Sequence, residues 1–342
     1  MIISATTVKD SRENVEKFVR RNLLGGIDHL VLFLDAPLPD VEDLLEGHPD
    51  VTFVRAYGEW WGDMAPGGLN SRQINNASLA SQLVAGMPWA DWMFMLDGDE
   101  VARLDLDVLA RLDPSIRAVR LLPMEAASRL HPDSDPTLFK RRLDDDELHL
   151  LHVLGVIKEP KLRSYFRGHM SGKPGVRPSP DHALGVHHVV HTGTRERVRG
   201  VTDPGLMLLH YESHNGDEFV RKWMALLSSG VDVRQHKKRA PLARSITALL
   251  ALGLPEDETA AFLEALYERV ALDDIATLAR LKLLVEIDPD AGQRRPRPPE
   301  AEIQQLRELL DRAYAAPKRV FRPRSQNPRT PRVIARLQQG VR

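Results

Sequence analysis

The residues best suited to chemistry form an acidic turn after an apolar stretch, in WADWMFMLDGDEVARLD (residues 89–105). A buried strand would deliver Asp97, Asp99 and Glu100 to one point, and Gly98 would let the backbone turn tightly between them. Three carboxylates this close repel one another unless a cation or hydrogen bonds compensate. Because Mg²⁺ and Mn²⁺ prefer oxygen ligands, we interpret the turn as a divalent-metal site. The alternative is an acidic surface turn, or a helix cap before Val101.

A second pattern is a basic segment rich in glycine and proline, RGHMSGKPGVRP (residues 167–178). Glycines let a backbone approach phosphate closely, and cationic side chains stabilise it. We therefore expect Lys173 and Arg177 to bind a phosphate group. The alternative is a solvated basic loop.

Histidine and tryptophan clusters leave two interpretations open. In HHVVH (residues 187–191) a strand would put His187 and His191 on one face, a spacing that could suit zinc or iron, although we favour packing or acceptor contacts for most of this cluster. Trp60 and Trp61 could form an apolar platform for a sugar or a base, or belong to the core.

The elements that must position these residues alternate between strands and helices in the first third of the chain. Apolar strands are expected at residues 1–8, 29–35, 51–56 and 91–97, with helices at about 12–24 and 71–86. This alternation predicts an α/β fold with a largely parallel sheet flanked by helices. Ligands of such sheets bind beyond the carboxyl ends of the strands, where Lys9, Asp35 and the acidic turn would lie.

The rest of the chain predicts a helical C-terminal region. Helical apolar stripes cover residues 217–229, 242–252, 256–271, 273–286 and 300–316, and GQRRPRPPE (292–300) reads as an exposed linker. We expect a catalytic domain over residues 1–235 and a helical region over 236–316. Residues 317–342 carry eight Lys or Arg and no acid, which predicts a basic, flexible tail. Such a tail could also contact an anionic membrane surface.

Composition narrows the class of protein. The 342 residues are 42% hydrophobic and 28% charged, as in a globular protein, and the net charge of −1 gives no reason to expect nucleic-acid binding. The absence of cysteine excludes disulfides, zinc-thiolate sites and cysteine nucleophiles. No stretch resembles a signal peptide or approaches the roughly 18 apolar residues of a membrane span. We therefore expect a cytoplasmic protein, able to work at the inner face of the membrane.

Several ordered segments of about the first 215 residues resemble the glycosyltransferase family 2-like group of bacterial enzymes, related to the family 92 type. The resemblance is carried by TTVKDSRENVEKFVRRNLLGGIDHLVLFLD, SRQINNASLASQLVAGMPWADWMFMLDGDE, RGHMSGKPGVRP and LLHYESHNGDEFVRK. It implies a GT-A fold, in which an Asp-x-Asp motif holds a divalent cation and a sugar nucleotide. The second strand ends in LDAPLPD, which departs from the commoner family pattern and indicates a different nucleotide pocket.

Carried over residue by residue, the resemblance makes Asp99 the main metal ligand and Asp97 a contact of the metal and the donor. Donor-binding roles around the nucleotide fall to Lys9, Asp35, Arg72 and Asn76. The resemblance also implies that His210, at the end of LMLLH, completes the metal coordination; a satisfied core histidine is the alternative.

The resemblance identifies no catalytic base. Inverting transfer needs a carboxylate or histidine within hydrogen-bond reach of the acceptor hydroxyl, and Glu125, Asp181 and His182 are the candidates.

The sequence thus predicts an enzyme of the hexosyltransferase type that moves a sugar from a nucleoside-diphosphate sugar, by default a UDP-sugar, with Mn²⁺ or Mg²⁺. The acceptor would be a hydroxyl of a glycan or a lipid-linked intermediate, and inversion is implied by the resemblance. A metal-dependent phosphohydrolase and a non-catalytic nucleotide-binding relative are the competing hypotheses.

Overall fold

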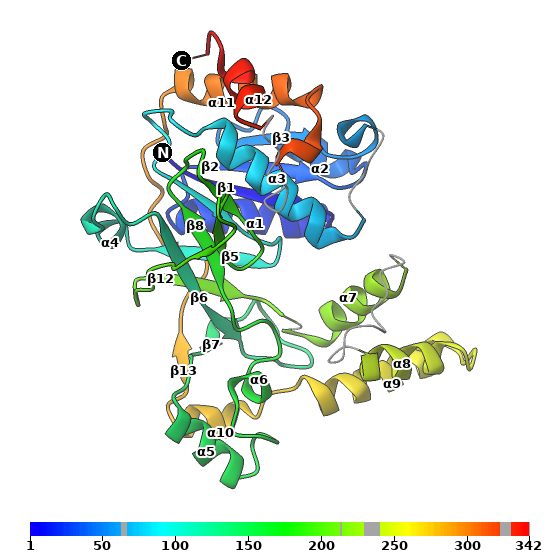
Figure 1. Ribbon diagram of the computed structural model, residues 1–342. Helices are drawn as coiled ribbons and strands as arrows, with labels where there is room; N and C mark the ends of the chain where they lie inside the picture. The colour runs from blue at the N-terminus through cyan, green and yellow to red at the C-terminus, as the bar shows by residue number, and fades with distance from the viewer. Residues whose placement is uncertain (63–66, 213, 229–239, 322–329, 342) are drawn as a thin grey trace. The chain divides into compact units, whose positions relative to one another are not determined.

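The structure is a computed structural model that describes residues 1–62, 67–212, 214–228, 240–321 and 330–341 (Figure 1). The chain divides into two compact units. The first contains Met1–Pro123, Ser171–Leu209 and Pro289–Arg342, and the second contains Met124–Met170 and His210–Asp288. Because the predicted boundary near residue 235 falls among residues 229–239, it lies outside the described part of the chain. The functional domain assignment stays a prediction.

The first unit is built on an open sheet. Its strands are β1 (Ile2–Val8), β2 (His29–Leu34), β3 (Val51–Arg55), β4 (Trp92–Met95), β5 (Glu100–Leu104), β8 (Lys173–Val176), most of β6 (Ala118–Ala126) and most of β12 (Leu206–His210). Strands β4, β1, β2 and β3 are adjacent and parallel, whereas β8 is antiparallel to both β4 and β6. A separate small sheet contains β9 (His182–Leu184), β10 (Val189–His191) and β11 (Arg197–Val198).

Helices cover both faces of this sheet, which explains why every residue of β1 is buried. Alternate residues such as Ile3 and Ala5 share a core with α3 (Leu69–Leu83), α11 (Glu300–Tyr314) and α12 (Thr330–Gln338). The opposite face packs on α1 (Arg12–Leu24), α2 (Pro39–Leu45) and α4 (Leu106–Arg111). The predicted α/β class, with a largely parallel sheet flanked by helices and a C-terminal helical region, is confirmed.

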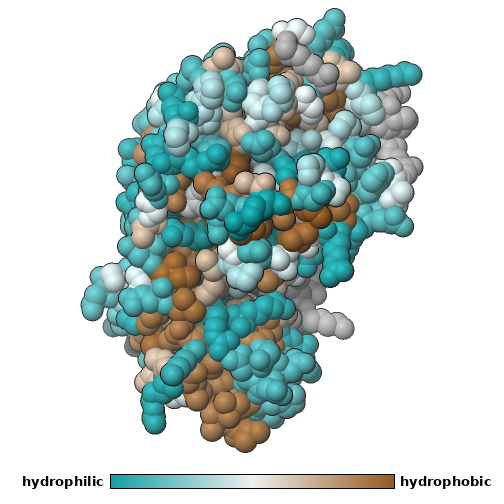
Figure 2. Space-filling model, turned by 90° about the vertical axis from the view of Figure 1, so that its left-hand side faces the viewer, coloured by the Kyte–Doolittle hydropathy of each residue, from teal (hydrophilic) through white to brown (hydrophobic). Residues whose placement is uncertain are grey.

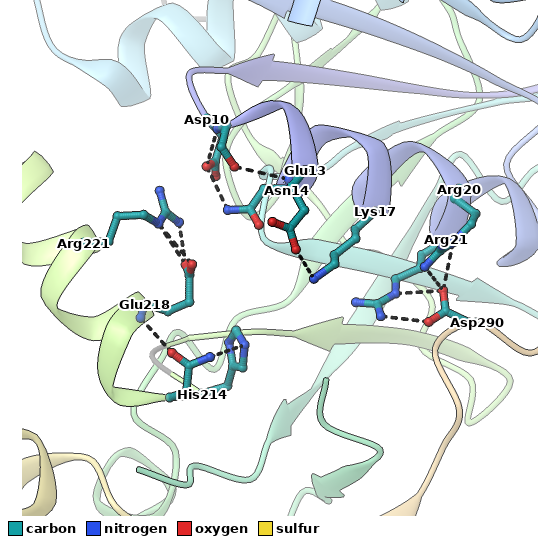
Figure 3. A network of polar contacts seen from close by, with 12 residues as sticks. Asp10, Glu13, Asn14, Lys17, Arg20, Arg21, His214, Glu218, Arg221 and Asp290 are labelled. Carbon is teal, nitrogen blue, oxygen red and sulfur yellow. Dashed lines mark hydrogen bonds and ion pairs between the residues drawn. The ribbon is translucent and has the colours of Figure 1, made fainter. Parts of the chain in front are cut away.

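Polar contacts fix the ends of α1 (Figure 3). Asp10 accepts hydrogen bonds from the backbone N–H of Ser11 and from the side chain of Asn14, and Ser11 caps the helix. Near the other end, the guanidinium groups of Arg20 and Arg21 each lie 2.8 Å from the carboxylate of Asp290. The segment after Asp290 is therefore anchored to α1.

The segment 292–300, predicted to be an exposed linker, also makes ion pairs. Arg295 lies 2.7 Å from the carboxylate of Asp28, and Arg294 pairs with Asp50. Both carboxyl groups are buried, so the arginines supply the positive charges that make their burial tolerable.

Part of the region predicted to be a flexible tail is folded. Among the described residues, Lys318–Phe321 forms a 3₁₀ turn (η3), and α12 follows after the undescribed residues 322–329. Phe321, Ile334 and Leu337 belong to the core beneath α3 and α11. The sequence did not predict this packing, because the few apolar residues of the segment are widely spaced among arginines.

The second unit contains the end of β6 with β7 (Leu138–Lys140) and β13 (Leu284–Glu286), paired antiparallel in that order. Its helices are α5 (Asp145–Val153), α6 (Leu162–Tyr165), α7 (Gly216–Ser228), α8 (Ala240–Leu250), α9 (Glu256–Val270) and α10 (Ile275–Arg280). The prediction of one helix over 273–286 is wrong in its second half. Lys282 has a positive φ of 58°, which breaks the helix, and β13 then gains hydrogen bonds from β7 that no local pattern reveals.

The surface of the second unit carries an apolar face on α5. Leu148 and Leu151 point into a small core, whereas Leu150, Val153 and Leu154 are exposed. Brown surface gathers at the bottom of Figure 2, the end at which Figure 1 draws α5. Within the described residues, no helix combines the length and apolar character that crossing a bilayer requires.

Lys318 gives a test of the C-terminal packing. Its ammonium donates to the carbonyls of Ala313, Tyr314 and Ala316 at 2.7–2.9 Å and lies 4.0 Å from the centre of the Trp60 ring. Lys318→Met leaves these carbonyls at the end of α11 without their donor, which we expect to lower the free energy of unfolding by at least about 2 kcal/mol. Urea unfolding followed by tryptophan fluorescence measures the loss.

The matched control is Lys17→Met, which removes a partly exposed lysine paired with Glu13 on α1. This change should cost less than about 0.5 kcal/mol. Equal costs for the two variants would contradict a capping role for Lys318.

Candidate functional site

Three parallel strands of the first unit end at the same edge of the sheet. β1 ends at Val8, β2 at Leu34 and β4 at Met95, and the carboxylates Asp35 and Asp97 follow the last two. The backbone N–H of Asp35 donates to the carbonyl of Val8 at 2.8 Å, so these ends are in register. This is the edge at which open α/β sheets bind their ligands.

The acidic turn folds as a closed corner between β4 and β5. The N–H of Asp97 donates to the carboxylate of Glu100 at 2.7 Å, and the N–H of Glu100 donates back to the carbonyl of Asp97 at 3.2 Å. The side chain of Glu100 is buried, whereas that of Asp97 is 26% exposed and that of Asp99 half-buried. Glu100 therefore shapes the corner from within, and the two aspartates form its outer side.

Lys173 supplies the cation that this corner needs. Its ammonium is fully buried and lies 2.6 Å from the Asp97 carboxylate and 3.4 Å from that of Glu100. Burial alone would lower the pKa of Lys173, but the charges of Glu100 and Asp97 together raise it. For Asp97, burial raises the pKa of the carboxyl, Lys173 opposes this, and Glu100 adds to it. Lys173 thus holds a permanent positive charge against the two acids.

The position of Lys173 follows from the pairing of β8. Met93 and Phe94 of β4 face Val176 and Gly175, so the antiparallel β8 begins at the carboxyl end of β4. A side chain on Gly175 would overlap the ring of Phe94, which explains the glycine. Within the segment expected to be a phosphate-binding loop, Lys173–Val176 therefore form a strand, because their backbone pairs with β4 and β6.

The first turns of α3 bring three polar side chains to the same edge. Arg72 makes a two-point ion pair with Asp35, both contacts at 2.7 Å, and Gln73 donates to Asp97 at 2.9 Å. Asn76, one turn later, donates to the hydroxyl of Thr7 on β1 at 3.0 Å. Sequence reasoning missed Gln73, although its position beside Arg72 in SRQINN was the available signal.

The structure thus places five of the sequence-predicted donor-binding residues in one polar cluster: Asp35, Arg72, Asn76, Asp97 and Lys173. We call this set, with Gln73 and Glu100, the carboxyl-edge cluster. Lys9 is exposed directly after β1. Arg177 lies at the other end of β8, where its guanidinium stacks 4.4 Å from the centre of the Trp92 ring, so it is separated from Lys173 by the length of the strand.

The remaining sequence candidates of the first unit are packed in the core, contact backbone groups or are exposed. Trp60 and Trp61 are 1% and 8% exposed and belong to the core, which leaves them no platform for a sugar. His187 contacts the carbonyl of Gly172, and His191 accepts from the N–H groups of Gly193 and Thr194. Asp181 is exposed in the turn before β9.

Glu125 lies in the second unit within a buried ion network. Its carboxylate is 2.8 Å from the ammonium of Lys140, which also pairs with Asp273 at 2.9 Å, and it accepts the N–H groups of Arg167 and Gly168. Burial alone would raise the pKa of Glu125, but the charges of Lys140 and His210 and these hydrogen bonds lower it. A carboxylate stabilised in this way is a weak proton acceptor. Its predicted role as base is therefore not favoured by its surroundings.

His210 is the last residue of β12 and is 2% exposed. Its Nε2 atom lies 3.7 Å from a carboxylate oxygen of Glu212, and its ring centre lies 4.7 Å from that of His169. Since Asp99 and His210 belong to different units, the ligand set implied by the resemblance stays a prediction.

The donor chemistry of the carboxyl-edge corner fits a divalent cation. Asp97, Asp99 and Glu100 offer three carboxylates at one turn, and the ammonium of Lys173 lies 2.6 Å from Asp97 and 3.4 Å from Glu100. Burial raises the pKa of Asp97, and the charges of Glu100 and Asp99 add to this effect while that of Lys173 opposes it. Oxygen ligands of this kind suit Mg²⁺ and Mn²⁺, with Asp99 on the outer side of the corner as the residue that would hold the ion.

No protein-family model matches the chain, and no curated protein matches it either. One similar solved structure is the 2.76 Å crystal structure of a putative glucose-1-phosphate thymidylyltransferase from Bacillus anthracis in complex with a sucrose. It overlaps with a TM-score of 0.28 and 9% sequence identity, over 52% of this chain and 72% of that chain. So loose an overlap carries no argument, and the function must be argued from the site itself.

Replacing Lys173 tests the charge balance of the corner. Lys173→Met leaves Asp97 and Glu100 close together without their ammonium, which we expect to cost about 3–5 kcal/mol at neutral pH. Because both carboxyls then bind protons more tightly in the folded state than in the unfolded state, the deficit should shrink as pH falls toward 5. Denaturant unfolding at several pH values measures this. A deficit that does not change with pH would argue for lost packing instead.

A second variant tests Glu125. Since its pKa is lowered in the fold, its ionised form contributes stability above pH about 4.5 that disappears as pH falls further. Glu125→Gln leaves Lys140 with one carboxylate fewer and should cost about 3–5 kcal/mol at pH 7, with the difference narrowing in acid. The exposed Asp181→Asn is the matched control and should unfold like the wild type. If Glu125→Gln leaves the free energy of unfolding unchanged, the ion pair of Glu125 with Lys140 does not stabilise the fold as predicted.

Proposed function

We propose that the protein is a divalent-metal-dependent glycosyltransferase that moves a sugar from a nucleoside-diphosphate sugar to a hydroxyl acceptor. The observation that supports it most is the carboxyl-edge cluster. Residues from β2, α3, β4 and β8, far apart in the sequence, meet at the edge where a nucleotide would bind. The sequence resemblance assigns donor-binding roles to most of these residues, and the sugar-nucleotide substrate comes from that resemblance.

In the proposed reaction, the residues of the carboxyl-edge cluster orient the sugar-nucleotide donor, and a bound cation would neutralise the charge of its diphosphate. Asp35 is fixed by both nitrogens of Arg72, which leaves second lone pairs on its oxygens to accept hydroxyl groups of a ribose. Asp97 is held by Gln73 and Lys173 and so presents a carboxylate of set direction to the donor. A divalent cation bound at Asp99 would neutralise the charge that grows on the leaving diphosphate.

Acceptor activation requires a group that takes the proton of the acceptor hydroxyl. Glu125 is engaged by Lys140, and Asp181 is an exposed carboxylate in a turn of the first unit. Of the two, we assign Asp181 to take the proton from an incoming hydroxyl, because Lys140 already holds the carboxylate of Glu125. The UDP-sugar donor, the inverting course, the glycan or lipid-linked acceptor and contact of the basic segment with a membrane remain parts of the proposal that follow from the sequence.

Calorimetric titration of UDP and GDP, with and without Mn²⁺, tests the function. We expect binding that strengthens when Mn²⁺ is present, because Asp99 would hold the ion and the ion would supply positive charge against the diphosphate. Asp99→Ala should lose this cation dependence while its unfolding curve stays that of the wild type. The matched control is Asp107→Ala, which removes an exposed acid from the first turn of α4.

The competing functions give different results. A phosphohydrolase would release phosphate from the nucleotide without an acceptor, and a non-catalytic relative would bind nucleotide without turning over any sugar nucleotide. If the nucleotide affinity is the same with and without Mn²⁺, and is also unchanged by Asp99→Ala, the proposed metal dependence is wrong.

A further inference from the structure

Three arginines of the first unit lie side by side at the end of β8 that is away from Lys173. Arg117 directly precedes β6, and Arg177 directly follows β8, its antiparallel neighbour (Figure 1). Ala118 is opposite Val176 in this pair, and the N–H of Arg177 donates to the carbonyl of Arg117 at 3.0 Å. The register therefore continues beyond the strands and makes the two arginines direct cross-strand neighbours.

Arg199 lies on the other side of Arg117. Val201 forms a parallel bridge with Val119, and a Cβ atom on Gly200 would lie 3.1 Å from the backbone of Val119. Arg199 and Arg117 each precede this bridge by two residues, so they are neighbours as well. Because adjacent strands are about 4.8 Å apart, the three arginines form a row about 10 Å long. We call it the arginine row.

The positive charge of the arginine row is not balanced by acids of the described chain. Among those residues, none forms an ion pair with any of the three guanidinium groups. Burial lowers the pKa of Arg177; the charge of Asp91 opposes this effect, and that of Arg117 adds to it. Asp91 itself lies 2.6 Å from the amino group of Met1. Since like charges directly opposite one another destabilise a sheet, the row costs stability unless an anion is bound.

The arginine row is also arranged to receive an anion. The Nε of Arg177 donates to the carbonyl of Ile116 at 3.1 Å, and its guanidinium stacks on Trp92, so this side chain has a set direction. Arg117 and Arg199 are exposed. Guanidinium groups bind phosphate oxygens through paired hydrogen bonds, and phosphate offers more oxygens and more charge than a single carboxylate.

We propose that the arginine row is a second anion site of the first unit, which binds phosphate groups without a metal ion. It lies at the opposite end of β8 from the carboxyl-edge cluster, for which the proposed function requires a divalent cation. The row supplies positive charge of its own, so this inference is independent of the transferase reaction. The phosphate group can belong to a soluble anion or to an anionic lipid headgroup, and two experiments separate these sources.

The first experiment uses inorganic pyrophosphate and the full-length protein in EDTA, which removes divalent cations. We expect calorimetry to show binding that weakens as the salt concentration rises, because the contacts are ionic. Arg117→Gln should lower the affinity by about 10-fold or more, since charge-assisted hydrogen bonds are lost. The same variant should unfold at a urea concentration equal to or above that of the wild type, because repulsion within the row is relieved. A purely structural role for Arg117 would lower that concentration instead.

The second experiment replaces pyrophosphate with phosphatidylcholine vesicles that contain or lack phosphatidylglycerol. Sedimentation of the wild type with phosphatidylglycerol vesicles alone, reduced about 10-fold or more in Arg117→Gln, assigns the row to lipid headgroups. Pyrophosphate binding without such sedimentation assigns it to soluble anions. Either result supports a phosphate site at the row.

The matched control is Arg336→Gln, which removes an exposed arginine of α12 in the same unit and in the basic C-terminal segment. It should leave both measurements unchanged. The inference is wrong if the wild type binds neither probe, if folded Arg117→Gln protein matches the wild type in both assays, or if Arg336→Gln weakens binding equally. Asp99→Ala should bind pyrophosphate in EDTA like the wild type, so the outcome is separate from that of the proposed function.

Discussion

The ion contacts of Lys173 with Asp97 and Glu100 are the constraint on which the first unit's binding edge depends. A tight turn puts three carboxylates after one strand, and charges this close in a partly buried place repel strongly. The pairing of β8 with β4 reduces this repulsion, because it places the fully buried ammonium of Lys173 beside Asp97 and Glu100. One strand pairing therefore decides whether the acidic corner can exist in folded protein.

The second unit repeats the same physical solution with other residues. Lys140, also on a strand and also fully buried, lies between Glu125 and Asp273 at 2.8 and 2.9 Å. Removing one partner of such a set is expensive because the others stay buried without their charge. Both units are thus organised around a lysine whose role is to permit carboxylates in the interior.

Sequence patterns predicted well what local chemistry controls. The apolar strands before Asp35 and Asp97, the capped helix after Ser11 and the glycine turn at Gly98 all follow from short-range rules, and the structure has them. What failed depended on partners far away in the chain. The strand that starts at Lys173 resembles a loop because it contains Pro174 and Gly175, and only pairing with β4 and β6 makes it a strand.

The candidate site shows the same division. The acids and Lys173 were recognisable by type, but their ion pair was not, since no spacing rule connects residues that are more than 70 positions apart. Gln73 was missed although it follows Arg72 directly, and Lys140 was missed because a lysine followed by two arginines resembles an ordinary basic surface segment. Side-chain types indicated the chemistry, and the sheet topology decided which of them met.

The packing of α12 has a consequence for how the protein acquires its shape during synthesis. Ile334 and Leu337 complete a hydrophobic core whose first strand begins at Ile2, and Gln338 donates to the carbonyls of Leu83 and Ala85 at the end of α3. The ribosome must therefore have made residues beyond 330 before that core can close. Until then the face of the sheet that carries Ile3 and Phe33 stays incompletely covered, and a growing chain with exposed strands of this kind is where chaperones act.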